Sequence, residues 1–188
     1  NSRISLSNND GGANNTIFGK LAGNAIAGGG TYNVAIGENA LLTEDTGDYN
    51  VAVGFDSLKD LNYDGNGGVI ALGNFAGANL TVGINNTLVG HNSLGTATTA
   101  VKNTALGWQA MADVKAGVAV DGCVAIGYSA LIGNSSNTTG INGTVAVGTS
   151  ALADLTTGAG NIAVGYNALN DLTTGERNLA FGYQAADS

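Results

Sequence analysis

The chain has one cysteine and one histidine among its 188 residues, and this shortage excludes several kinds of site. Cys123 alone cannot form a disulfide within the chain. One cysteine and one histidine cannot supply a metal cluster of thiolates and imidazoles. His91 has no neighbour in the sequence that would complete an acid–base or nucleophilic pair. We therefore expect no catalytic residues, no enzyme activity and no organic cofactor.

Charged residues are also scarce, at 11% of the chain, and acidic residues outnumber basic ones by 14 to 6. The basic residues are scattered and form no stripe, so nucleic acid is not an expected partner. No stretch approaches the ~18 consecutive apolar residues of a membrane span, so we expect no membrane insertion. Half of the acids fall between residues 38 and 64, where we expect them to form a solvated negative face.

What the chain does contain is a nine-residue phrase, Asn-x-Ala-(apolar)-Gly-x-x-(Ala/Ser)-(Leu/small), which returns about ten times. Its central glycines are Gly19, Gly37, Gly54, Gly73, Gly90, Gly107, Gly127, Gly148, Gly165 and Gly182. The basic step is 17 residues, with occasional insertions of one to four residues. A fixed step of this kind is typical of a solenoid, in which each repeat forms one turn stacked on the last. We predict an all-β solenoid of about ten turns.

The three residues before each glycine are predicted to form a short β-strand, because they are aliphatic or Thr in nearly every turn. Alternation places the first and third residues on one face and the central residue, usually Ala, on the other. We expect the Val and Ile face to fill the interior of the solenoid. We expect the Ala face to meet another backbone closely, across a thin roll or, as we favour, from a neighbouring subunit. That predicted oligomer interface comprises Ala35, Ala52, Ala71, Ala105, Ala125, Ala146, Ala163 and Ala180.

The corner glycine should supply a sharp bend before a second apolar segment in each turn. The asparagine four residues before it, as in Asn33 and Asn50, is expected to form a structural ladder between turns. Insertions such as residues 62–68 and 133–143 fall in the outer part of the turn, where a stacked coil tolerates them.

We expect residues 1–14 to form a partial or degenerate leading turn and residues 15–188 to form one elongated solenoid domain. At about 4.8 Å per turn the domain would be a rod roughly 50 Å long. The chain begins without Met and has no recognisable capping sequence, so we expect it to be a segment of a longer fibre.

The position after the corner glycine is often aromatic, and stacked turns would place these side chains in one stripe. The aromatic residues there are Phe55, Trp108, Tyr128, Tyr166 and Tyr183. Such a row could bind glycans on its ring faces. It could equally protect the corner or fill a seam between subunits, and we favour this second interpretation.

Residues 60–65, Asp-Leu-Asn-Tyr-Asp-Gly, match the first half of a calcium loop. Asp60, Asn62 and Asp64 would supply oxygen ligands for Ca²⁺ at alternate positions. The twelfth position is Ala71 rather than a bidentate Glu. We expect an ordinary polar turn here, with Ca²⁺ binding as the alternative.

The units at residues 33–37, 50–54 and 161–165 resemble the head repeats of trimeric autotransporter adhesins (YadA-like). The longer unit at residues 161–175, Asn-Ile-Ala-Val-Gly-Tyr-Asn-Ala-Leu-Asn-Asp-Leu-Thr-Thr-Gly, resembles repeats in phage tail-fibre proteins, and the resemblance covers about residues 15–186. It implies a left-handed β-roll packed as a parallel homotrimer and offers no catalytic residues. The implied partners are other copies of the chain, flanking fibre domains, and a host glycan or protein receptor.

We therefore expect a structural or adhesive segment of a phage tail fibre or similar appendage, on a virion or outside a cell. A trimeric adhesin of a bacterial cell surface has the same architecture and is the alternative. A ligand- or ice-binding solenoid would need a regular Thr-x-Thr array on every turn, but Thr clusters in irregular outer turns. A polysaccharide-processing β-helix would need acids facing a groove, for which residues 38–64 are the only candidate.

Overall fold

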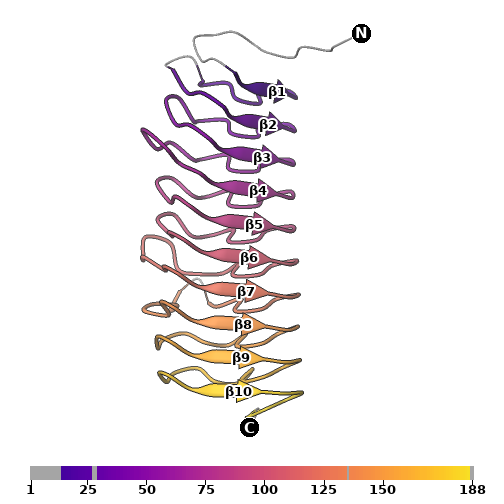
Figure 1. The fold of residues 1–188 in the computed structure, drawn as a ribbon, viewed down its shortest axis with the longest axis vertical. Helices are drawn as coiled ribbons and strands as arrows, with labels where there is room; N and C mark the ends of the chain where they lie inside the picture. Colours follow the sequence, from indigo (N-terminus) through magenta and orange to yellow (C-terminus); the bar gives the residue numbers. More distant parts are fainter. Residues whose placement is uncertain (1–13, 27–28, 135, 187–188) are drawn as a thin grey trace.

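A computed structural model of the chain describes residues 14–26, 29–134 and 136–186, which form a parallel β-solenoid (Figure 1). Each described turn contributes one three-residue strand to a single sheet. The strands are β1 (Thr16–Phe18), β2 (Val34–Ile36), β3 (Val51–Val53), β4 (Ile70–Leu72), β5 (Thr87–Val89), β6 (Thr104–Leu106), β7 (Val124–Ile126), β8 (Val145–Val147), β9 (Ile162–Val164) and β10 (Leu179–Phe181). The predicted solenoid of about ten turns is confirmed. The predicted leading turn lies, except for residue 14, outside the described residues.

The strands pair in sequence order, and every pair is parallel and in register. Ala35 lies opposite Ala52, and the register is kept where the step lengthens, so that Ala105 still pairs with Ala125. The extra residues are absorbed by loops on the side of the turn away from the glycine corner, and these loops differ in length along the rod (Figure 1). The placement of the insertions in the outer part of the turn is therefore confirmed.

The two faces of the strands are the reverse of our expectation. The predicted interface alanines are Ala35, Ala52, Ala71, Ala105, Ala125, Ala146, Ala163 and Ala180, and all of them are buried inside the roll. The residues on either side of them point outward and are half-buried or exposed, as in β3, where Val51 and Val53 flank Ala52. The prediction of a subunit interface on the alanine face is therefore wrong, because these side chains are enclosed by their own chain.

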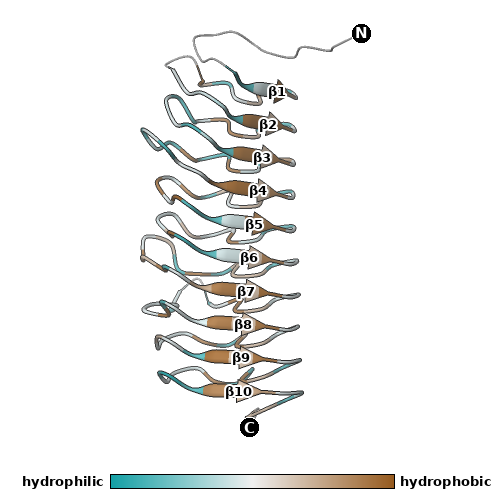
Figure 2. Ribbon diagram, in the orientation of Figure 1, coloured by the Kyte–Doolittle hydropathy of each residue, from teal (hydrophilic) through white to brown (hydrophobic). Residues whose placement is uncertain are grey.

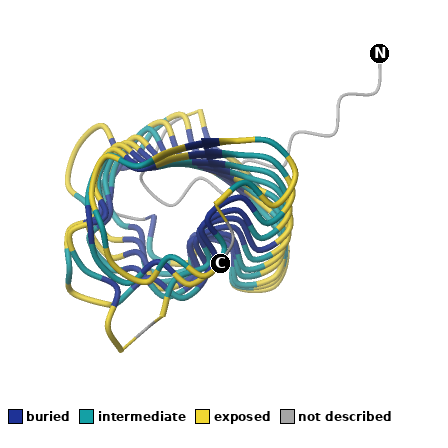
Figure 3. Cartoon of the chain, turned by 90° about the horizontal axis from the view of Figure 1, so that it is seen from below, coloured by how far each residue is buried: buried dark blue, intermediate teal, exposed yellow. Residues whose placement is uncertain are grey.

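The interior explains why the strand carries alanine. Opposite the sheet, the second segment of most turns places a small residue and then a leucine or methionine into the same space, as in Ala130 and Leu131, both fully buried. Seen along the rod, the buried residues line the inner side of the coil (Figure 3). Since protein interiors are packed to crystal-like density, a roll this narrow that already holds leucine has room for little more than a methyl group on the strand.

The asparagine column forms the predicted ladder. Nδ2 of Asn33 donates to the carbonyl of Gly47 at 2.7 Å, and Oδ1 of Asn33 accepts from the backbone N–H of Asn50 at 2.8 Å. The same pair of bonds recurs at Asn103, which donates to the carbonyl of Val120 and accepts from the N–H of Cys123. Asn33 and Asn103 therefore each join their own turn to two backbone groups of the next turn, whereas Asn50 makes only the accepting bond, from the N–H of Val69. The structural role of the column is confirmed.

Cys123 occupies the asparagine position of its turn. Its Sγ lies 3.1 Å from the carbonyl oxygen of Ile141, so the thiol takes the place of the amide donor. Burial raises the pKa of this thiol to about 11. The side chain is consequently a neutral spacer in the ladder.

Candidate interaction surfaces

The outward residues of the strands form one apolar surface along the rod, which we call the outer face. Its first column is Thr16, Val34, Val51, Ile70, Thr87, Thr104, Val124, Val145, Ile162 and Leu179. Its second column is Phe18, Ile36, Val53, Leu72, Val89, Leu106, Ile126, Val147, Val164 and Phe181. Figure 2 shows the strands as a mostly hydrophobic band, interrupted where a strand begins with Thr.

The outer face has the size and the chemistry of a candidate interaction surface. Strands ~4.8 Å apart with a rise of ~3.3 Å per residue give it an area on the order of 450 Å². The largest contiguous apolar patch on a soluble monomer is typically about 300–600 Å² and often functional, so a face of this size is a candidate interaction surface. None of its residues is charged, and depletion of charge is typical of the centre of a protein interface.

The predicted aromatic stripe exists, with two additional members and one break. Phe55, Phe75, His91, Trp108 and Tyr128 contact one another in successive turns. Tyr166 and Tyr183 form a separate stacked pair. Phe75 was not predicted because it lies one residue later in its turn than the aromatic column. His91 belongs to that column, and its imidazole packs between Phe75 and Trp108.

The stacking limits what the stripe can bind. The Trp108 and Tyr128 rings lie 4.8 Å apart and within 7° of parallel, so each covers one face of the other. The Tyr166 and Tyr183 rings lie 5.2 Å apart at 11°. A glycan that stacks on ring faces therefore cannot use the two faces that each of these stacked pairs holds against each other.

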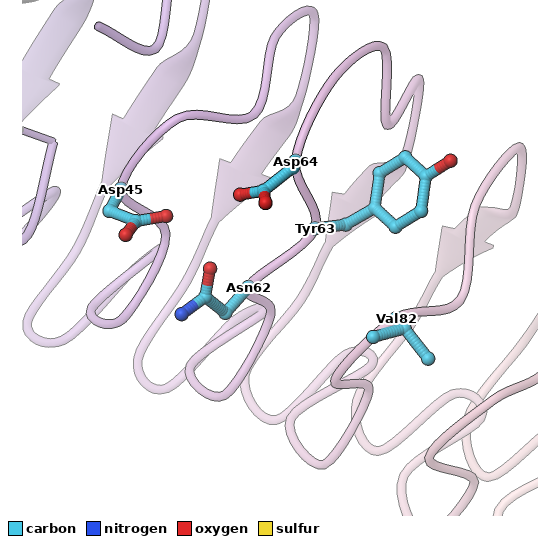
Figure 4. A pocket seen from close by; sticks show the side chains of 5 residues that line it. All are labelled: Asp45, Asn62, Tyr63, Asp64 and Val82. Carbon is cyan, nitrogen blue, oxygen red and sulfur yellow. The ribbon is translucent and has the colours of Figure 1, made fainter. Parts of the chain in front are cut away.

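The calcium-like segment does not assemble its predicted ligands. Asn62 and Asp64 line an open cavity together with Asp45, Tyr63 and Val82, and Asp60 does not (Figure 4). The Asp60 carboxylate instead lies 3.3 Å from the ammonium group of Lys59. Among the described residues, no group of three or more Asp, Glu, His or Cys side chains is placed to hold a metal ion. The segment is better described as the polar turn that the sequence favours.

Glu44 is not part of the solvated negative face that we expected the acids between residues 38 and 64 to form. Its side chain is fully buried, at the position of the turn that Ile26 and Leu61 occupy in the adjacent turns. The carboxylate accepts from the backbone N–H of Gly47 at 2.7 Å and, more weakly, from that of Tyr63 at 3.4 Å. Burial raises the pKa of the Glu44 carboxyl above its ordinary value, and these hydrogen bonds only partly offset the shift.

The geometry defines a class, the parallel β-solenoid with turns of about 17 residues. No family model, no curated protein and no solved structure matches the chain. Within the described residues, no helix is long and apolar enough to cross a membrane.

Proposed function

We propose that this chain is a structural segment of a fibre, the rigid shaft of a phage tail fibre or a similar appendage on a virion or cell surface. In this proposal three parallel copies pack side by side through their outer faces, and the segment performs no catalysis. The observation that supports it most strongly is the uncharged apolar outer face, which extends over every described strand.

The geometry of the outer face suits a parallel assembly. Because every strand lies in register with the next, copies that run in parallel at the same height would bring equivalent residues together along the whole rod. An interface of standard size buries about 800 Å² per partner. The outer face, on the order of 450 Å², would supply the apolar centre, and residues beside the strands would supply a polar rim.

Two threonines would fix the height at which the copies meet. Thr87 and Thr104 are paired in neighbouring strands, and both lie on the outer face. In copies at equal height, these hydroxyl groups would meet their own equivalents and could bond to one another. A shift of the copies along the rod would place the hydroxyl groups against aliphatic side chains, which costs free energy because the buried hydroxyl loses its partner.

The sequence resemblance to adhesin heads and phage tail-fibre repeats agrees with this proposal. If the chain follows these repeats, the coil would be left-handed, flanking domains would extend the shaft, and a host glycan or protein would be the receptor. A solenoid also suits a shaft physically, because each turn is stabilised by its neighbours and the stack behaves as one cooperative rod.

The proposal is tested with charge on the outer face. In the double variant Val124→Asp/Val145→Asp, each acid would be forced into the centre of the interface, so we expect the assembly to dissociate. The matched control is Ala116→Asp/Ala119→Asp, which adds the same charges to exposed positions in the loop before β7. We expect the parent and the control to resist heat and protease and the outer-face variant to lose that resistance. Equal resistance of all three proteins would contradict the proposal.

A further inference from the structure

The break in the aromatic ladder leaves two ring faces opposite each other. The corner residues that follow β7, β8 and β9 (Figure 1) are Tyr128, Thr149 and Tyr166. The backbone N–H of Ser150 donates to the carbonyl of Tyr128 at 2.9 Å, and that of Asn167 donates to the carbonyl of Thr149 at 3.0 Å. These bonds hold the three corners in register, with Thr149 between the two tyrosines.

Each tyrosine has one covered face and one free face. Trp108 covers Tyr128 from the preceding turn, and Tyr183 covers Tyr166 from the following turn. The centroid separations, 4.8 Å and 5.2 Å, are close to the spacing of neighbouring strands, so the rings stack along the rod. The uncovered face of Tyr128 and that of Tyr166 are therefore directed toward each other across Thr149.

The width of this slot selects the shape of an occupant. Two turns separate the rings by roughly 9.6 Å, and contact between carbon atoms is optimal at about 3.5–4.0 Å. A flat ring touching both faces would need only ~7–8 Å, so it could pack well against one tyrosine only. A puckered pyranose ring, which carries hydrogens on both sides, is thicker and fits the larger gap. Its C–H groups also carry the partial positive charge that the negative face of an aromatic ring attracts.

The floor and rim of the slot suit a sugar as well. Thr149 is exposed, and in the described part of the chain its hydroxyl takes part in no side-chain hydrogen bond. Tyr128 and Tyr166 are 53% and 46% exposed, so a ligand can reach them from solvent. The Thr149 hydroxyl can donate to or accept from a sugar hydroxyl at the floor of the slot.

We propose that the slot formed by Tyr128, Thr149 and Tyr166 binds one pyranose ring of a glycan between the two tyrosine faces. This inference deepens the receptor-binding part of the proposed function by naming a site and a ligand class. It does not depend on the trimer, so its failure would leave the proposed shaft unaffected.

The test is saturation-transfer NMR on the intact chain with three separate probes, the methyl pyranosides of glucose, galactose and mannose. We expect transfer to the ring C–H protons of at least one probe. Thr149→Tyr should reduce that transfer at least tenfold, because the new ring fills the slot and continues the ladder. Tyr128→Ala should reduce it similarly. The control is Tyr49→Ala, which removes an equally exposed ring stacked on Tyr32, away from the slot, and should retain binding.

Circular dichroism melting identifies any variant that fails to fold, and Thr149→Tyr is expected to melt no lower than the parent. Absence of transfer to all three pyranosides would overturn the proposal. Equal transfer in the parent and in Thr149→Tyr would also overturn it. Binding of a flat probe such as phenol in the slot, without pyranoside binding, would overturn the assignment of the ligand class.

Discussion

At the scale of single residues, the corner glycine combines two requirements that only glycine meets. Gly127 has φ = +137°, and a Cβ on it would lie 2.5 Å from the carbonyl oxygen of Gly148 in the next turn. At Gly182, φ is +130°, but the nearest such atom is the Cβ of Ala185 at 4.0 Å. The two positions therefore share the backbone strain and differ in the contact with the next turn.

We therefore predict that a Gly→Ala substitution lowers the stability of the solenoid by different amounts at the two positions. Gly182→Ala should destabilise the solenoid by the ~1–3 kcal/mol of a strained backbone conformation. Gly127→Ala should cost about 2 kcal/mol more, because the added methyl group overpacks a backbone contact. Urea unfolding of both variants measures the difference. Equal losses of stability would show that the turn can open at this corner without cost.

Glu44 predicts a dependence of stability on pH. The pKa of its carboxyl is raised in the folded state, above an unfolded value of about 4.3. Its contribution to stability is therefore fully present below pH ~4.3 and is lost as the pH rises through the folded pKa. Glu44→Gln removes the titration and keeps an oxygen that can accept from Gly47. The variant should gain stability relative to the parent between pH 4 and pH 7, measured by urea unfolding. A constant difference across this range would mean that burial does not govern this carboxyl.

At the scale of the repeating element, the asparagine ladder predicts that an Asn→Ala substitution lowers stability by an amount that depends on its position in the rod. Asn103→Ala would leave the N–H of Cys123 without its partner inside the roll, and the carbonyl of Val120 would keep only the weak bond from the N–H of Val101 at 3.4 Å. An unsatisfied buried group costs ~1–3 kcal/mol, so we expect a loss of at least about 1–3 kcal/mol from the Cys123 N–H, with a smaller addition from the weakened bonding of Val120. Asn178→Ala is the matched control, because the described side-chain bond that Asn178 donates is a single bond to Asn161 in the last pair of turns. Thermal unfolding should rank Asn103→Ala well below the control, and similar midpoints would argue against a cooperative ladder.

The element scale also shows what the sequence could and could not predict. Column alignment predicts every strand, because Val34–Ile36 and its equivalents stand at a fixed distance from the glycine. Alternation alone does not say which face lies inside when both faces are apolar, and the volume of the leucines across the roll decides it. Leu58 and Leu131 adopt φ of +48° and +49°, a conformation that leucine disfavours by itself. Stacking between turns imposes it, so propensity could not have predicted it.

For the candidate sites too, the sequence predicts some features and only the folded structure shows the others. Aligned columns predict that Trp108 and Tyr128 lie close together, but not that their rings cover each other's faces. The break at Thr149 is visible in the sequence only once the stacking direction of the rings is known. The calcium pattern at Asp60, Asn62 and Asp64 describes spacing along the chain, whereas the fold turns Asp60 toward Lys59. Spacing predicts a site only where the backbone geometry is also that of the motif.

At the scale of the whole molecule, the proposed trimer requires the outer face to be covered by other copies of the chain. The alanines lie inside the rod, and an uncharged apolar strip, the outer face, lies outside. In a single rod this strip is exposed to water, which is unfavourable because of the hydrophobic effect. Association of three rods around a common axis would remove the strip from water in every copy at once.

Light scattering of the purified chain after size-exclusion chromatography tests this claim most directly. If three copies pack through their outer faces, we expect a single species with a mass near three times the 18.5 kDa of one chain, stable on dilution to micromolar concentration. A folded species with the mass of one chain under the same conditions would contradict it.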